Sequence, residues 1–532
     1  MSSSNLHIIQ KQVVDITLPD MRSAMEWEDR ERDIFTGMIR NQLERCLDEF
    51  QTGDEHLVIE KLQIDLGSFT MKNLYDEMPA RFYAAMTSHL QEHRQKITKY
   101  SGTFSKKEED IFYGNDKKKD RSFTGAQARM LALHFYLVNG YLPWWGTQLA
   151  GWDQDWLAGL STEEIGHLRD FLTAENDTPL LRIASQFSEE FTNLLLEKLG
   201  VSGNLHEPVN WLQQLISHFE KTDPANGFKT FRWTTDPSGS KIISLLNTTA
   251  MRRQYWFRWL SFSCGKQGEP ALHQLMGGHE VLVFVLRSLV RNNIRYNDFV
   301  QQVPAVWKNE MEMMREEIID ASDPYTVLGN HGKAGFAGKP FAPPDAVPDK
   351  SPATREGKNK EEPGEEESIY VNEAGLVLLH PFLPQLFRNL GWMDDNNFFI
   401  VQGKDKAVYA LYYLATGESR AQEYDMLLPK LLMGIPWELP LEPVEVLSDI
   451  ERTTCDELLA AVINHWSVLK NTSPDGLREG FLQRSGKLTF GQVGWRLTVE
   501  PKTQDILMGR LPWGISIIKL PWMKGMLTIT WQ

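Results

Sequence analysis

The sequence predicts a mainly helical α+β protein with a small N-terminal α/β module, a helical middle and a C-terminal domain of helices and a β-hairpin. Three observations predict this class. Apolar residues recur every three or four positions through most of the chain, which is the period of an amphipathic helix. Strict alternation of apolar and polar residues, typical of a half-buried strand, is confined to short stretches near the two ends. An acidic segment at 330–368 separates the last domain from the rest.

Composition sets the size of the core and excludes one class of partner. The chain has 532 residues, of which 42% are hydrophobic, with 17 Trp and 26 Phe, so it can bury a sizeable core. At about 100–200 residues per domain, this length predicts three domains, with two or four as the alternatives. Acidic residues number 71 and basic residues 56, which gives a net charge of −15. Because binding to phosphates requires an excess of Lys and Arg, this charge opposes a nucleic-acid partner.

The cysteines and the longest apolar runs indicate a protein of the cytoplasm. Cys46, Cys264 and Cys455 lie far apart and form no CxxC pair, which predicts three buried or half-buried thiols in a reducing compartment. The runs at 281–290 and 375–387 are broken by Arg or Pro and fall short of the roughly 20 apolar residues that span a bilayer. The first residues lack the basic and apolar regions of a signal peptide. We therefore expect a soluble protein with no membrane partner.

The first 99 residues predict a βαβα module. Val14, Ile16 and Leu18 alternate with polar residues, which predicts a strand over 13–18. The other expected elements are an amphipathic helix over 28–50, a second strand over 62–66 and a helix over about 75–97. Residues 100–123 are polar and mixed in charge, so they predict a linker.

The middle, 124–329, predicts a helical domain with short Gly, Pro and Asn breaks. Its expected helices cover 124–140, 162–174, 179–199, 241–262, 279–291 and 305–319. Ser161 or Thr162, followed by Glu164, is a start signal for the second of these. No repeat period emerges, so nothing supports a solenoid.

One run in this middle domain has two interpretations. The sequence RRQYWFRWL at 252–260 interleaves basic and aromatic residues, which would suit stacking on single-stranded nucleic acid. However, Tyr255, Trp256 and Trp259 also fit one buried stripe of a helix, with Arg258 at its edge. We favour the buried stripe.

The acidic segment that follows cannot form a core. Residues 345–368 hold eight acids and four bases but no aromatic residue. Such a composition buries too little apolar area to offset its ordering entropy, so 330–368 predicts a disordered linker.

The C-terminal domain, 369–532, predicts helices followed by strands. Gly391 is placed to end a first helix, Thr454 with Glu457 predicts a capping box, and Ser473 before Pro474 predicts a helix start. The stretch 488–499 around GQVG predicts a hairpin, and 527–531 alternates as a last strand.

No motif in the sequence predicts catalysis. The Gly-rich run at 332–340 has the wrong spacing for a phosphate loop and no preceding strand. No HExxH, GxSxG or EF-hand pattern occurs. His380 and His465 lie on apolar helical faces, where a core or rim histidine is expected rather than a metal ligand. We therefore predict no catalytic, cofactor-binding or metal site, and an enzyme is the least supported class.

Four tryptophans are the candidate interface residues. Trp437, Trp513 and Trp522 each follow a proline, which places a large ring beside a rigid turn, and Trp is enriched at interface hot spots. For any one of these three, packing within the domain's own core is the favoured interpretation. Trp531 ends the last strand, where an exposed edge would accept a partner strand.

Two regions resemble a known family. The N-terminal segments LHIIQKQVVDITL at 6–18 and LVIEKLQIDLGSF at 57–69 are similar to the opening of contractile injection system tape measure proteins. The C-terminal match is more specific. Its blocks are YVNEAGLVLLHPFLPQLFRNLGW at 370–392, LLMGIPWELPL at 431–441, HWSVLKNTSPDGLREGFLQRSGKL at 465–488 and LPWGISIIKLPWM at 511–523.

This resemblance implies a structural or assembly component of a phage-tail-like extracellular contractile injection system, of the antifeeding-prophage and virulence-cassette type. It implies control of tube and sheath length, with tube, baseplate or cap proteins as partners and with assembly in the bacterial cytoplasm. The released extracellular particle is a second expected location. The family contributes no catalytic or cofactor residues, and the oligomeric state stays open.

The physical objection to a ruler is its expected shape. An extended helix of 532 residues would span about 800 Å. The strand patterns, the 26 Pro and the acidic linker predict compact domains instead. A compact assembly adaptor, or a factor that nucleates or caps the tube, is therefore the alternative function.

Overall fold

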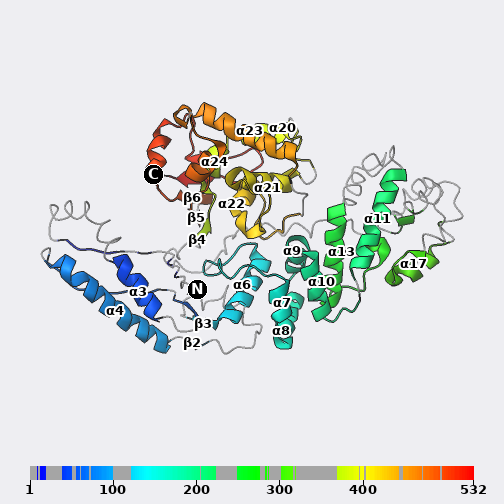
Figure 1. Ribbon diagram of the computed structural model, residues 1–532, viewed down its shortest axis with the longest axis horizontal. Helices are drawn as coiled ribbons and strands as arrows, with labels where there is room; N and C mark the ends of the chain where they lie inside the picture. The colour runs from blue at the N-terminus through cyan, green and yellow to red at the C-terminus, as the bar shows by residue number, and fades with distance from the viewer. Residues whose placement is uncertain are drawn as a thin grey trace, which may run out of the picture. The chain divides into compact units, whose positions relative to one another are not determined.

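The computed structural model describes residues 7, 9, 12, 14–18, 39–50, 55–59, 61–70, 73–96, 98–99, 121–203, 205–222, 248–275, 279, 282–283, 286, 301–315, 318, 368–394, 396–400, 403–442, 447–469, 471–491 and 494–531. The chain forms two compact units, Met1–Trp152 and Asp153–Gln532, here called unit 1 and unit 2. The described elements are mainly helical, with one sheet in each unit (Figure 1), which confirms the predicted α+β class. The domain boundaries expected from the sequence remain predictions.

Unit 1 combines three described helices with a three-stranded sheet. Its elements are α3 (Arg40–Phe50), β1 (Glu55–Val58), α4 (Leu74–Lys96), β2 (Thr98–Lys99), β3 (Arg121–Thr124) and α6 (Gly125–Asn139). Strand β3 is central, antiparallel to β1 and parallel to β2. Thr124 caps α6 through a capping box with Gln127, and Gly140 at φ +80° ends it.

One core cluster of unit 1 forms between α3 and α4, and a second forms between its sheet and α6. Apolar residues spaced by four along α4 lie on one face and pack against Ile39 and Cys46; they are Leu74, Met78, Phe82, Met86 and Leu90. The helix expected over 75–97 is thus confirmed. The helix expected over 28–50 is confirmed from Arg40 onward, and 28–38 lies outside the described residues.

Both strands expected in the N-terminal module are wrong as strands. Residues 14–18 and 62–66 belong to no ladder, and the sheet uses Glu55–Val58 instead. Leu62, Ile64 and Leu66 nevertheless do turn toward the α3–α4 core. Alternation therefore showed which side chains face the core, but it did not require hydrogen bonding to a neighbouring strand.

The helical part of unit 2 lies between Asp153 and the acidic segment. Its elements are α7 (Gln154–Gly159), α8 (Thr162–Ala174), α9 (Thr178–Gln186), α10 (Glu189–Lys198), α11 (His206–Thr222), α13 (Thr248–Ser263), α14 (Leu272–Leu275), η2 (Ala305–Trp307) and α17 (Lys308–Met313). Ser161 is the N-cap of α8 and forms a capping box with Glu164, as expected. The single helix expected over 179–199 is two helices, because Ser188 caps α10 and breaks the run.

The aromatic run on α13 is a core stripe, as favoured. Tyr255, Trp256 and Trp259 are buried, and the Tyr255 hydroxyl donates to the carbonyl of Leu205 at 2.7 Å. The thiols of Cys46, Cys264 and Cys455 are free and buried, as the sequence predicted. The Gly-rich run at 332–340, most of the expected helix 279–291 and nearly all of both expected linkers lie outside the described residues.

The C-terminal part of unit 2 places helices beside a five-stranded sheet (Figure 1). Its helical elements are η3 (Ala374–Leu379), α20 (Leu383–Asn389), α21 (Gly403–Thr416), η4 (Glu423–Asp425), α22 (Leu427–Leu432), α23 (Asp449–His465), η5 (Ser467–Leu469), α24 (Pro474–Leu477), η6 (Arg478–Leu482) and η7 (Thr503–Arg510). Its strands are β4 (Ser368–Val371), β5 (Gly486–Gly491), β6 (Gly494–Val499), β7 (Ile517–Ile518) and β8 (Leu527–Thr530).

Strand order corrects one expectation and confirms another. The order is β4-β5-β6-β8-β7, and β5 and β6 form the expected antiparallel hairpin. The last strand, β8, lies between β6 and β7, so it is not the exposed edge expected beside Trp531. The pattern of a strand does not reveal its neighbours, which is why the sequence could not predict this order.

Helix ends in this part follow the expected chemistry in two of three places. Gly391 follows α20 at φ +70°, and Ser473 caps α24 with Pro474 at its first position. The capping box expected at Thr454 is wrong. Helix α23 begins earlier, where Ser448 pairs with Glu451, and Thr454 lies inside it.

Candidate functional site

The most unusual polar feature of unit 2 is a buried joint between α9 and the C-terminal part. Helix α9 contains the buried apolar residues Leu180, Leu181 and Ile183. Arg182 lies among them, and its side chain is fully buried. A buried guanidinium is costly unless charges and acceptors surround it. The partners of Arg182 come from residues about 240 positions further along the chain.

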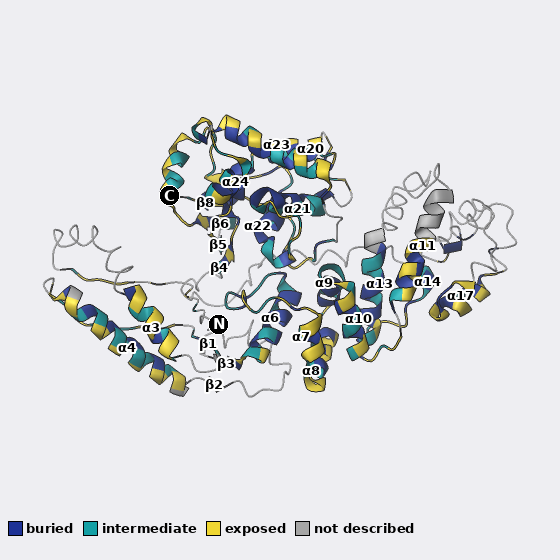
Figure 2. Cartoon of the chain, in the orientation of Figure 1, coloured by how far each residue is buried: buried dark blue, intermediate teal, exposed yellow. Residues whose placement is uncertain are grey.

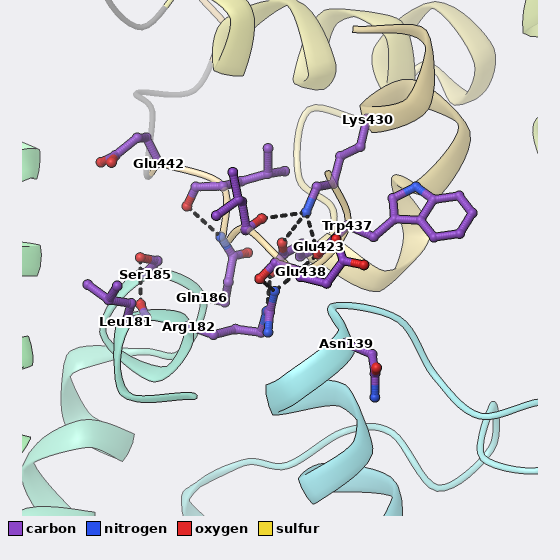
Figure 3. Close-up of polar contacts among 12 residues, drawn as sticks. Asn139, Leu181, Arg182, Ser185, Gln186, Glu423, Lys430, Trp437, Glu438 and Glu442 are labelled. Carbon is purple, nitrogen blue, oxygen red and sulfur yellow. Dashed lines mark hydrogen bonds and ion pairs between the residues drawn. The ribbon is translucent and has the colours of Figure 1, made fainter. Parts of the chain in front are cut away.

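Three charged side chains form the centre of the joint (Figure 3). Arg182 Nε donates to Oε2 of Glu423 at 2.9 Å, and Lys430 Nζ donates to Oε1 of the same carboxylate at 2.6 Å. Each of the three side chains has 0% exposure. Glu423 opens η4 and Lys430 lies in α22, seven residues later, so the local fold brings these two together. Helix α9 supplies the third charge.

The loop after α22 completes the joint through its carbonyl groups. Arg182 Nη2 donates to the carbonyls of Trp437 and Glu438, at 3.1 and 2.7 Å. Lys430 Nζ donates to the carbonyls of Trp437 and Leu439, at 3.0 and 2.7 Å. All three protons of the Lys430 ammonium group therefore have acceptors. Because the centre holds two cations and one carboxylate, these carbonyl dipoles stabilise the remaining positive charge.

Further contacts fix the same loop to the helical part. Gln186 Nε2 of α9 donates to the carbonyl of Leu441 at 3.2 Å, and Arg253 of α13 pairs with the carboxylate of Glu442. The backbone N–H of Glu442 donates to Asp405 Oδ1 at 3.0 Å. Figure 3 shows Gln186 and Arg182 reaching the loop from one helix. The loop is thus held by α9, α13, α21 and α22 together.

Burial shifts the pKa of two groups in and beside the joint. Desolvation lowers the pKa of the Lys430 ammonium, and the adjacent Glu423 carboxylate opposes that shift. Desolvation raises the pKa of the Asp405 carboxyl to about 6, against the opposing hydrogen bond from the Glu442 N–H. The charged centre is therefore maintained by its partners and not by water.

The geometry of the joint suits mechanical coupling. Each of the donors of Arg182 and Lys430 is directed at an acceptor within the protein.

Among the described residues, no group of three or more His, Cys, Asp or Glu side chains is arranged to hold a metal ion. The described helices also include none that is both long enough and apolar enough to cross a membrane.

The four tryptophans expected at an interface all donate their indole N–H within unit 2. Trp437 Nε1 donates to the carbonyl of Leu427, and Trp437 itself is buried. The other three are half-buried and donate to the Leu378 carbonyl (Trp513), the Leu432 carbonyl (Trp522) and Asp505 Oδ2 (Trp531). The structure does not bring the four into one cluster of contacts, and their role at an interface remains a prediction.

Sequence patterns missed the charged residues of the joint. A lone arginine in the apolar run LLRIA, at 180–184, was the available signal, because charged residues are almost never fully buried unless they are paired. The second half of the block LLMGIPWELPL, which resembles a known family, is the loop that Arg182 and Lys430 hold.

The fold and the joint define a mainly helical protein whose distant segments are held together by internal polar contacts. Comparison with protein families identifies it further. The chain belongs to the contractile injection system tape measure protein family, whose model matches residues 6–531. This match confirms the resemblance seen at the two ends and extends it across the helical middle. No curated protein and no solved structure matches the chain.

Proposed function

We propose that this protein controls tube and sheath length during assembly of a phage-tail-like extracellular contractile injection system, and that unit 2 acts there as a folded body. Membership of the tape measure family supports a structural role in such a system. The joint around Arg182 supports the folded body, and it is the observation on which this proposal depends.

An extended helical ruler would be incompatible with the joint. In one continuous helix, residues 182 and 423 would lie about 360 Å apart, because 241 positions separate them and each adds about 1.5 Å. Their side chains are instead in direct contact. Opening the joint would separate Arg182 from its buried carboxylate, and breaking a buried pair of this kind costs about 3–5 kcal/mol. The described helices are also short, with α4 reaching 23 residues, or about 35 Å.

The proposed partners follow from this role. Tube, baseplate or cap subunits are the expected partners, assembly takes place in the bacterial cytoplasm, and the released particle is the second proposed location. Tape measure proteins are structural, and we propose no catalytic activity for this one.

A compact assembly factor is the second candidate. An adaptor, or a factor that nucleates or caps the tube and then leaves, would also require a folded body, and the joint favours it equally. Mass spectrometry of purified particles separates the two candidates. A length-controlling component is retained in the particle, whereas an assembly factor is absent.

The test of length control is a strain that lacks the protein. Negative-stain electron microscopy should show particles whose sheaths vary widely in length, and the intact gene should restore one length. A complete absence of particles would favour the assembly factor instead. Uniform sheaths of normal length in the deletion strain would overturn the proposal.

A further inference from the structure

The two faces of the five-stranded sheet in unit 2 differ sharply. Alternate side chains of β4, β5, β6, β7 and β8 are buried on one face; they are Ile369, Val371, Leu488, Leu497, Val499, Ile518, Leu527 and Ile529. The intervening side chains lie on the opposite face. We call this opposite face the basic sheet face; it comprises Ser368, Tyr370, Lys487, Thr489, Arg496, Thr498, Ile517, Thr528 and Thr530.

The basic sheet face carries positive charge on an acidic protein. None of the five strands contains Asp or Glu, although the chain as a whole has a net charge of −15. Residues 484–531 hold seven basic and two acidic residues, a net charge of +5. Arg496 is exposed and Lys487 is half-buried, and the described part of the chain gives neither of them an ion-pair partner. On the sheet face itself, the five strands therefore place two cations, Lys487 and Arg496, and no carboxylate.

Exposed apolar side chains accompany the two cations. Ile517 is 61% exposed and Tyr370 is 44% exposed, and Met526, just before β8, is 43% exposed. Hydroxyl groups occupy most of the remaining positions, at Thr489, Thr498, Thr528 and Thr530. Aromatic residues, Met and Arg are enriched at protein interfaces, and Tyr370, Met526 and Arg496 supply one of each here.

We propose that the basic sheet face docks an acidic surface of another subunit of the injection system. Two cations among hydroxyl and apolar groups suit the carboxylates and apolar side chains of a protein better than a phosphate backbone. Nucleic acid is bound mainly by many Lys and Arg contacts, and the net charge of −15 repels it. This inference rests on the proposed function, because it takes the partner from the same particle.

The size of the face indicates what kind of contact it forms. Neighbouring strands are about 4.8 Å apart, so five strands span about 20 Å. Strands of two to six residues give the face a height of about 15 Å. The resulting area of about 300 Å² is less than half of what one partner contributes to a stable interface. The contact is therefore weak and depends on charge, so salt should weaken it.

The test uses the full-length protein and the purified tube, baseplate and cap subunits of the same system. Binding is measured pairwise by biolayer interferometry at 50 and 300 mM NaCl, with duplex DNA as a separate probe. Three variants are compared with wild type: Lys487→Glu/Arg496→Glu, the neutral Lys487→Gln/Arg496→Gln, and a control that makes the same charge change elsewhere, Lys308→Glu/Arg420→Glu. Both control residues are exposed and lie outside the sheet.

We expect at least one subunit to bind and to do so at least tenfold more weakly at 300 mM NaCl. Charge reversal on the sheet should weaken that binding at least tenfold, the neutral variant should weaken it less, and the control should change it less than twofold. The inference is overturned if no subunit binds, if the sheet and control variants behave alike, or if only DNA binds. A normal sheath length in the strain lacking the protein would instead contradict the proposed function, so the two failures are distinguishable.

Discussion

Arg182 Nε lies 2.9 Å from Oε2 of Glu423, although 241 residues separate them in the sequence and neither side chain is exposed. This contact joins the helical part of unit 2 to its C-terminal part. Lys430 shares the carboxylate, and loop carbonyls accept the remaining protons of the ammonium group. The joint therefore holds the two parts of unit 2 in one arrangement. It does so only while Arg182, Glu423 and Lys430 are all present.

Arg182→Met should destabilise unit 2 by about 3–5 kcal/mol. The substitution removes the guanidinium that donates to the buried Glu423 carboxylate and to two loop carbonyls. Urea unfolding followed by circular dichroism measures the change in the free energy of unfolding. The matched control is Arg452→Met on α23, which removes an ion pair whose side chains are 36% and 92% exposed. That loss should stay below about 1 kcal/mol. Equal losses in the two variants would contradict the importance assigned to the joint.

Gly375→Ala should prevent stable folding of the C-terminal part of unit 2. A Cβ at this position would lie 1.7 Å from the carbonyl oxygen of Phe481, and that backbone cannot move away without disrupting η6. We expect a loss of at least about 3 kcal/mol, or no soluble protein. Gly166→Ala on α8 is the control, since a Cβ there meets nothing within 4 Å. It should stabilise the protein by about 0.5–1 kcal/mol through helix propensity.

Glu373→Gln should stabilise the protein at pH 8 and have little effect at pH 5. Burial, followed by the nearby Asp425 carboxylate, raises the pKa of the Glu373 carboxyl from 4.5 to about 7. The folded state thus binds the proton more tightly than the unfolded state. This contribution to stability is complete below about pH 4.5 and is lost as the pH rises through about 7. The glutamine removes the ionisation, so the gain at pH 8 is at most about 3 kcal/mol.

Urea unfolding of both proteins at pH 5 and pH 8 measures this difference. Other carboxyls with raised pKa values, such as Asp405 at about 6, are present in both proteins and cancel in the comparison. The exposed Glu457→Gln on α23 is measured in parallel as the control for the Glu-to-Gln change itself. The same gain at both pH values would mean that Glu373 ionisation has no part in it.

Trp513→Phe should cost stability and leave particle assembly intact. The Trp513 indole N–H donates to the Leu378 carbonyl at 3.0 Å, and its ring meets Phe382 edge-on. Loss of this hydrogen bond should lower the free energy of unfolding by about 1 kcal/mol. Particle yield by negative-stain microscopy is the second measurement. Unchanged stability with loss of particles would favour the interface interpretation of Trp513 instead.

Local chemistry predicted much of the fold. Ser161, Ser473 and Gly391 mark helix ends where the sequence placed them, because capping depends on residues a few positions apart. The start of α23 was missed for a local reason. Ile450, in the first turn of α23, is exposed, and the buried residues of the helix begin only at Cys455. The apolar spacing therefore placed the helix start at Thr454, about a turn and a half after the true N-cap, Ser448.

Long-range features could not be predicted in this way. No short pattern links Arg182 to Glu423, and nothing in the sequence of β8 shows that it lies between β6 and β7. Both depend on how distant segments pack, which a single sequence does not display. The candidate site is therefore visible only in the structure, although one of its segments, LLMGIPWELPL, resembles the family in sequence.

The central claim is that unit 2 acts as a folded body, and sheath length tests it most directly. Forty residues of a flexible Gly/Ser repeat, whose two ends can lie side by side, are inserted between Ser202 and Gly203, which are exposed in the turn between α10 and α11. Negative-stain electron microscopy then gives the distribution of sheath lengths. A folded body predicts the same length as wild type, since the insertion extends from the surface. A uniform increase in sheath length would show that the chain is measured end to end and would contradict a folded unit 2.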